Sequence, residues 1–195
     1  MQPNFKIVGE KQLQAELRRI ADTMEDAAEP MRAVSLVLLR ETERIFAQEG
    51  RGVGLDEDWA PLSDVTKHQR ALAASGGRQF GKRGKELKSY STAKGGVMKI
   101  LQRSGKLAGS VTPTSDSHSA GITSNRRYAA TMFFGAEQGQ FGRDRHNHPL
   151  PWGNIPARPF FPVRDIHGTP RLTERAERSV IAELLRYLQP PGSVA

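Results

Sequence analysis

The residues best suited to metal chemistry are Asp144, His146 and His148, which lie close together in the chain. Imidazole nitrogens and carboxylate oxygens are common metal ligands. The two histidines face the same side only if the backbone between them is extended, and no third ligand follows at helical or hairpin spacing. We therefore interpret them as exposed loop residues and predict neither a metal ion nor a cofactor.

A second group of possible ligands is the acidic run Asp56-Glu57-Asp58. Carboxylates at such spacing can bind a hard cation through oxygen. A tryptophan, Trp59, follows the run immediately, which is unusual for a cation loop. A solvated acidic loop, or a docking surface for a basic neighbour, is the better interpretation.

Sequence motifs of enzymes are missing from the chain. It contains no nucleophile elbow, no phosphate-binding loop and no dinucleotide fingerprint. The stretch Gly81-Lys82-Arg83-Gly84-Lys85 has glycines and lysines, but their spacing does not suit a phosphate cradle. We predict no catalytic residue and no enzymatic activity.

Positive charge is concentrated between residues 66 and 106, where Glu86 is the only acid. Glycines interrupt this segment repeatedly, so we predict a flexible basic arm or loop over residues 66–99. Such an arm could neutralise DNA phosphates without reading bases, or it could order against a neighbouring subunit. The candidates for either contact are Lys82, Arg83, Lys85, Lys88 and Lys94.

The composition sets the class of protein. The chain has 195 residues, a net charge of +8 and no cysteine, which suits a single domain over residues 1–195 without disulfides. A basic balance favours contact with nucleic acid, acidic proteins or anionic surfaces. No stretch approaches the length of a membrane span, and the N-terminus lacks the apolar run of a signal peptide.

Apolar spacing predicts the regular elements. A short strand over residues 5–8 precedes a helix over 10–27, and a second helix runs from about Pro30 to Gln48. Strands over 107–114 and 119–124 form a hairpin, residues 128–134 suit either a strand or a helix, and a last helix covers 173–189. The fold class is therefore α+β: a small antiparallel sheet packed with two N-terminal helices and a C-terminal helix, with a long basic, glycine-rich loop or arm.

Two short stretches carry residues that suit contacts. Trp59 looks like an anchor that pins a loop onto the core, and Ser63 or Asp64 could cap a helix after it. Arg158 lies in a proline-rich run over residues 155–162, which we expect to be extended and at an edge or surface. A stiff backbone lowers the entropy cost of a salt bridge from Arg158, either to another subunit or within the chain. Phe160 and Phe161 would point to opposite faces.

The order of these motifs resembles the phage virion morphogenesis or tail-completion family of Mu-like and P2-like phages. The resemblance rests on Trp59-Ala60-Pro61-Leu62, Leu101-Gln102-Arg103-Ser104-Gly105-Lys106-Leu107, Tyr128-Ala129, Phe134-Gly135 and Ile155-Pro156-Ala157-Arg158-Pro159-Phe160. The same order recurs in the neck and minor-tail proteins of long-tailed phages.

The resemblance implies a structural virion protein that forms a ring, commonly six-fold, at the head-proximal end of the tail. It implies contacts with the tail tube protein and the head–tail connector proteins. A contact with genomic DNA in the channel of such a ring rests separately on the charge of the basic arm. We expect the protein in the tail or neck of the virion, in the host cytoplasm during assembly, and not at a membrane. The expected interface or motif residues are Trp59, Pro61, Leu62, Tyr128, Phe134, Gly135, Arg158, Pro159 and Phe160.

The leading function is therefore completion or termination of the tail and its joining to the head connector. The alternative is a nucleic-acid-binding accessory protein that acts through the basic segment 66–106. Ring formation agrees with the first function, because head-to-tail contacts between identical subunits close into cyclic rings.

Overall fold

A computed structural model describes residue 18 and the ranges 26–165 and 168–188 of the chain. The strand expected over residues 5–8 and nearly all of the helix expected over 10–27 lie outside these residues. The described part is an α+β fold with two small antiparallel sheets, as the sequence predicts. None of its helices is long and apolar enough to cross a membrane.

The central element is helix α2, Ala28–Ala47, which begins two residues before Pro30. This agrees with the predicted helix, since proline is tolerated in the first turn, where its missing N–H leaves no bond unmade. The buried side of α2 carries Val34, Val37, Leu38, Ile45 and Phe46. The chain leaves the helix through Gly50 at a φ of +70°, where a Cβ atom would collide with the Trp59 indole.

The predicted hairpin is confirmed. Strand β1, Val111–Ser115, pairs antiparallel with β2, Ala120–Ser124, and both lie against α2. The turn is fixed by Asp116, whose Oδ1 accepts hydrogen bonds from the backbone N–H groups of His118 and Ser119 at 2.8 and 2.7 Å. The first strand begins later than expected because Ala108–Ser110 forms a 3-10 turn (η1) instead.

Helix α6, Glu174–Leu188, packs on α2 and confirms the predicted C-terminal helix. Thr173 Oγ1 accepts a hydrogen bond from the backbone N–H of Ala176 at 3.4 Å, which satisfies one free donor of the first turn. Arg175 Nε also donates to the Glu41 carboxylate at 3.2 Å. The short strands β3, Val163–Arg164, and β4, Arg171–Leu172, precede the helix and were not predicted.

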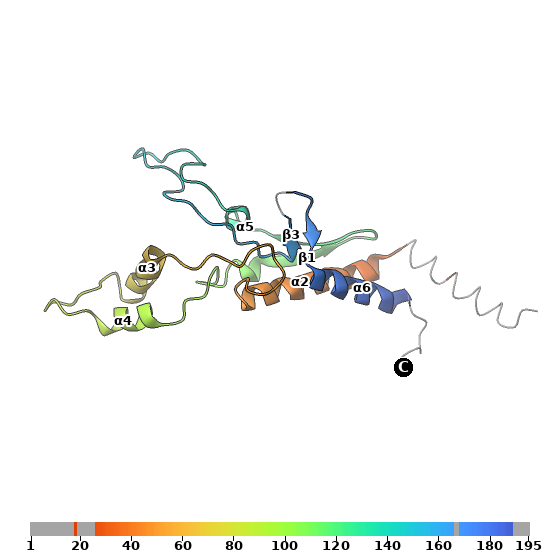
Figure 1. The fold of residues 1–195 in the computed structure, drawn as a ribbon, viewed down its shortest axis with the longest axis horizontal. Helices are drawn as coiled ribbons and strands as arrows, with labels where there is room; N and C mark the ends of the chain where they lie inside the picture. The colour runs from red at the N-terminus through yellow and green to blue at the C-terminus, as the bar shows by residue number, and fades with distance from the viewer. Residues whose placement is uncertain (1–17, 19–25, 166–167, 189–195) are drawn as a thin grey trace, which may run out of the picture.

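Two long excursions project from this body (Figure 1). One holds helices α3, Asp64–Ala74, and α4, Lys88–Gly95. The other is the loop 137–154, which is closed at its base by the bridge between Ala136 and Ile155. Helix α5, Ala129–Phe134, lies between the body and this loop. The apolar run 128–134, for which the sequence allowed a strand or a helix, therefore forms a helix.

The basic segment is a projecting arm, but it has more regular structure than its glycines suggested. Ser63 caps α3 by accepting from the Thr66 N–H. The α4 side chain of Tyr90 is fully buried against α3, where its hydroxyl shares a 2.6 Å hydrogen bond with His68 Nδ1. Gly76, Gly77, Gly81 and Gly84 fall between the two helices, and Gly95 and Gly96 end α4, so the glycines do not prevent helix formation.

We expect Tyr90→Ala to destabilise the arm while the body stays folded. Truncation of a fully buried aromatic side chain costs about 3–5 kcal/mol, and Tyr90 packs within the arm. Hydrogen exchange should therefore accelerate in α3 and α4 and remain unchanged in β1 and β2. Phe80→Ala is the matched control, because Phe80 is an exposed aromatic residue of the same arm. Equal acceleration throughout the chain would contradict this account of the arm.

Candidate functional site

Trp59 joins two distant parts of the chain. Its Nε1 donates a 2.7 Å hydrogen bond to the Pro159 carbonyl, although the two residues are 100 positions apart. The indole is only 3% exposed and packs edge-on against Phe46, with 5.7 Å between ring centroids. Trp59 is therefore an anchor, as the sequence predicts, and its partner is the proline-rich run.

Arg158 makes the reciprocal contact. Its Nε and Nη2 donate to the Ala60 carbonyl at 3.1 and 2.9 Å, and Nη2 also reaches the Pro61 carbonyl at 3.3 Å. The Arg158 backbone N–H donates to the Met132 carbonyl at 2.9 Å. Residues 59–61, 132 and 158–159 thus form one hydrogen-bonded unit, which we call the joint.

The structure corrects the expected surroundings of Arg158. The residue is 8% exposed, so the centre of the proline-rich run is buried instead of lying on a surface. Among the described residues, its guanidinium donates to carbonyls and forms no salt bridge within the subunit, while a salt bridge to a neighbouring subunit stays a prediction. Burial lowers the pKa of Arg158, and the nearby charge of Arg70 lowers it further. Arginine nevertheless stays protonated in proteins, so the joint contains a partly desolvated positive charge.

The two phenylalanines after Arg158 also differ from expectation. Phe160 is buried in the core, but Phe161 packs against the same core instead of pointing away from it. The ring centroid of Phe133 lies 5.4 Å from that of Phe160 and 5.5 Å from that of Phe161. The alternation of an extended strand is lost because the chain turns here, with the Val163 N–H donating to the Phe161 carbonyl.

Gly135 lets two backbone segments approach closely at the edge of the joint. Its φ is +77° and its ψ is −178°, a conformation almost restricted to glycine. A Cβ atom would lie 2.7 Å from the Ile155 carbonyl oxygen and 2.8 Å from the Ala157 nitrogen. The preceding Phe134 is half exposed and stacks edge-on against Phe133.

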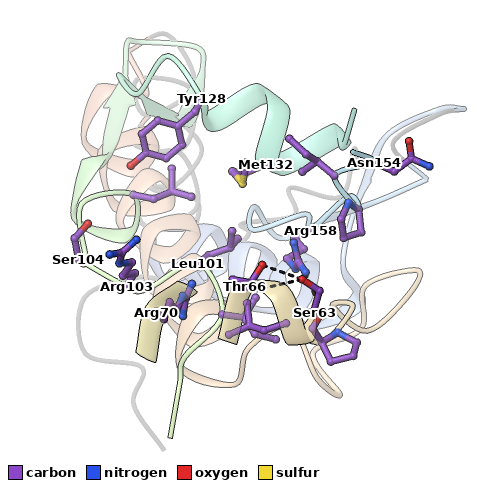
Figure 2. A pocket seen from close by; sticks show the side chains of 16 residues that line it. Ser63, Thr66, Arg70, Leu101, Arg103, Ser104, Tyr128, Met132, Asn154 and Arg158 are labelled. Atoms are coloured by element: carbon purple, nitrogen blue, oxygen red, sulfur yellow. Dashed lines mark hydrogen bonds between the residues drawn. The ribbon is translucent and has the colours of Figure 1, made fainter. Parts of the chain in front are cut away.

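Beside the joint lies an open hollow of about 590 Å³, drawn in Figure 2. It is bounded by α3, the 100–107 segment, α5 and the proline-rich run. All but one of the motifs on which the family resemblance rests contribute to its wall. The lining residues are Pro61, Leu62, Ser63, Thr66, Arg70, Ile100, Leu101, Arg103, Ser104, Leu107, Tyr128, Met132, Asn154, Ile155, Pro156 and Arg158.

The structure therefore brings most of the predicted motif residues together. Trp59, Arg158, Pro159 and Phe160 form or adjoin the joint, while Pro61 and Leu62 line the hollow. Tyr128, which is 44% exposed, lines the hollow as well. Whether any of them contacts another subunit stays a prediction.

The arm cations are separate from the hollow. Lys82, Arg83, Lys85, Lys88 and Lys94 are all exposed on the arm, and none of them lines the hollow. Sequence reasoning grouped Arg70 and Arg103 with these cations and so missed their place in the hollow. The position of Arg103 within the Leu101–Leu107 motif was the one available signal.

The histidine group of the second excursion is a loop structure. Asp144 Oδ1 accepts from the backbone N–H groups of His146 and His148, at 2.8 and 2.9 Å. The His148 backbone bond is the main cause of a lowered pKa of Asp144. Across the residues that the structure describes, no three potential ligands are grouped to hold a metal ion.

Comparison with known proteins identifies the family. The model of the phage virion morphogenesis family matches residues 73–189, which is more than half of the chain. The chain belongs to this family, and the protein is therefore a virion-associated phage protein with a role in virion morphogenesis. No curated protein and no solved structure matches the chain.

We expect Gly135→Ala to destabilise the protein by more than about 2 kcal/mol, since it adds a backbone collision to an unfavourable conformation. Gly105→Ala is the matched control. Gly105 also has a positive φ, of +68°, but no atom lies near its Cβ position, so about 1 kcal/mol is expected. Urea denaturation of both variants gives the comparison, and equal losses would contradict the close approach at the joint.

Proposed function

We propose that this protein is a ring-forming subunit that completes the phage tail and helps to join it to the head connector. The observation that supports the proposal is the joint, where motifs that resemble those of tail-completion proteins meet. The arm and the 137–154 loop both start next to it. A fixed joint gives both projections a defined direction, and ring subunits need two different surfaces that meet head to tail.

A structural role also fits the chemistry of the hollow better than catalysis does. Its hydroxyl groups, on Ser63, Thr66, Ser104 and Tyr128, have no histidine or carboxylate beside them in the lining. A hydroxyl nucleophile is commonly activated by such a base. The tail tube and connector proteins are the proposed partners, at the head-proximal end of the tail.

A second candidate function is nucleic-acid binding through the arm. The five arm cations are exposed, and none is paired with a carboxylate in the described part of the chain. Free cations on a projecting arm can neutralise phosphates and release counterions. Within a ring, the same arm could instead contact DNA in the channel or the neighbouring ring, so this activity does not exclude the first.

Deletion of the gene from the phage tests the leading proposal. We expect electron microscopy to show full heads without attached tails, or tails of abnormal length, because the tail end is left unfinished. Purified protein should form a closed oligomer in size-exclusion chromatography with light scattering. Normal tails attached to full heads in the deletion phage would refute the proposed role.

Neutralising the arm tests what its charges do. We expect a variant with Lys82, Arg83, Lys85 and Lys88 changed to glutamine to fold normally, since all four side chains are exposed. Phage yield should fall, and any DNA affinity should become weaker and less dependent on salt. Circular dichroism and thermal unfolding provide the folding control. An unchanged phage yield would show that the charges are dispensable for assembly.

A further inference from the structure

The hollow has a concentration of positive charge without a matching acid. Arg70, Arg103 and Arg158 all line it, whereas no aspartate or glutamate does (Figure 2). Burial lowers the pKa of Arg70, and the charge of Arg103 lowers it further. Arg70 acts in the same direction on Arg158. Arg70 is therefore close enough to feel the charges of both Arg103 and Arg158, and this local excess of positive charge favours an incoming anion.

Each arginine keeps capacity for another partner. Arg158 uses Nε and Nη2 for the joint, and its Nη1 has no acceptor among the described residues. No buried side-chain nitrogen or oxygen in that part of the chain lacks a partner, so Nη1 is open to solvent. Arg70 uses Nη1 for the Lys99 carbonyl at 2.8 Å, and the exposed Arg103 has neither a hydrogen bond nor an ion pair there.

The walls of the hollow suit a protein side chain better than a DNA backbone. Apolar residues, namely Pro61, Leu62, Ile100, Leu101, Leu107, Met132 and Ile155, form much of the lining. Arg158 is 8% exposed, so an anion must enter the hollow to reach it. A carboxylate on a protruding loop can enter, whereas the phosphates of a duplex lie along a wide rod.

The chain itself supplies a loop with matching charge. Asp56-Glu57-Asp58 is its only run of three acids, and all three residues are exposed. Asp56 Oδ2 accepts from the Asp165 N–H at 2.6 Å, and Asp58 Oδ1 accepts from the Gly52 N–H at 3.1 Å. These bonds fix the loop and leave Glu57, which has no such bond, as its free carboxylate. None of the three acids lines the hollow of its own chain.

We propose that the arginine-lined hollow of one subunit receives the acidic loop 56–58 of a neighbouring copy of the same chain. The inference rests on the proposed ring, because it pairs two different surfaces of identical subunits head to tail. In this proposed contact, Glu57 of one copy lies nearest the three arginines of the other. A guanidinium fork binds a carboxylate in a defined geometry, so the contact would also set the angle between subunits.

The absence of cysteine from the chain makes disulfide trapping a direct test. A Glu57→Cys protein is mixed with a Ser104→Cys protein, since Ser104 is an exposed residue of the hollow, and the mixture is oxidised. We expect a heterodisulfide between positions 57 and 104, identified by mass spectrometry. Thr114→Cys, exposed on the hairpin, replaces Ser104→Cys in the control mixture.

A charge change in the hollow sharpens the test. Adding Arg103→Glu to the Ser104→Cys copy should reduce the heterodisulfide on the order of tenfold, because the introduced carboxylate then faces Asp56 and Asp58, which remain charged in the Glu57→Cys copy. Adding Arg40→Glu instead, on the exposed side of α2, should leave the yield unchanged. In the cysteine-free protein, Glu57→Arg and Arg103→Glu should each weaken the oligomer, and the two changes together should restore it.

The outcomes separate this inference from the proposed function. If the wild-type protein forms a ring but the 57–104 heterodisulfide of the cysteine variants does not exceed the control, the docking contact is overturned and the ring proposal stays intact. If the protein forms no oligomer and no cross-link, both the docking contact and the ring proposal are contradicted. If the protein binds duplex DNA, Arg103→Glu abolishes that binding and no heterodisulfide forms, the hollow binds DNA phosphates and the inference is overturned.

Discussion

Trp59 and Arg158 hold together two segments that lie about 100 residues apart, and the positions of both projections depend on this joint. The indole N–H and the guanidinium are strong donors that are costly to bury without acceptors. Each finds its acceptor on the other segment: Trp59 on the Pro159 carbonyl, and Arg158 on the carbonyls of Ala60 and Pro61. Neither segment can therefore move without leaving a buried polar group unpaired.

The joint gives the Trp59 and Arg158 motifs a structural role in the fold. Trp59 precedes residue 73, where the family match begins, while Arg158 lies within the match. Gly135 brings the end of α5 against the backbone of residues 155–157. The same packing leaves the hollow open on one side, so a structural requirement of the fold also produces the surface that we propose for docking.

The sequence predicted those elements that depend on residues close together in the chain. The spacing of apolar residues located α2 and α6, the cap of α3 was narrowed to Ser63 or Asp64, and the two strands of the hairpin were expected close to where they lie. Each of these depends on residues only a few positions apart. The six residues of α5 were too few to distinguish a helix from a strand by periodicity.

Features that depend on distant contacts could not be predicted in this way. The helix around Tyr90 is short and rich in polar residues, and it is stabilised by packing on α3 that its own sequence does not reveal. The proline-rich run looked like a surface segment because prolines lack donors, but its Pro159 carbonyl accepts from the buried Trp59, 100 residues earlier in the chain. Arg70 and Arg103 likewise read as parts of a basic segment until the fold placed them beside Arg158.

The central claim is that the protein is a ring subunit whose copies meet through the hollow beside the joint. Cryo-electron microscopy of the intact virion, at a resolution that shows side chains in the head–tail region, tests it most directly. The account predicts a closed ring of copies in which the loop 56–58 of each subunit enters the arginine-lined hollow of the next. A ring with every hollow open to solvent, or a single copy without cyclic neighbours, would contradict it.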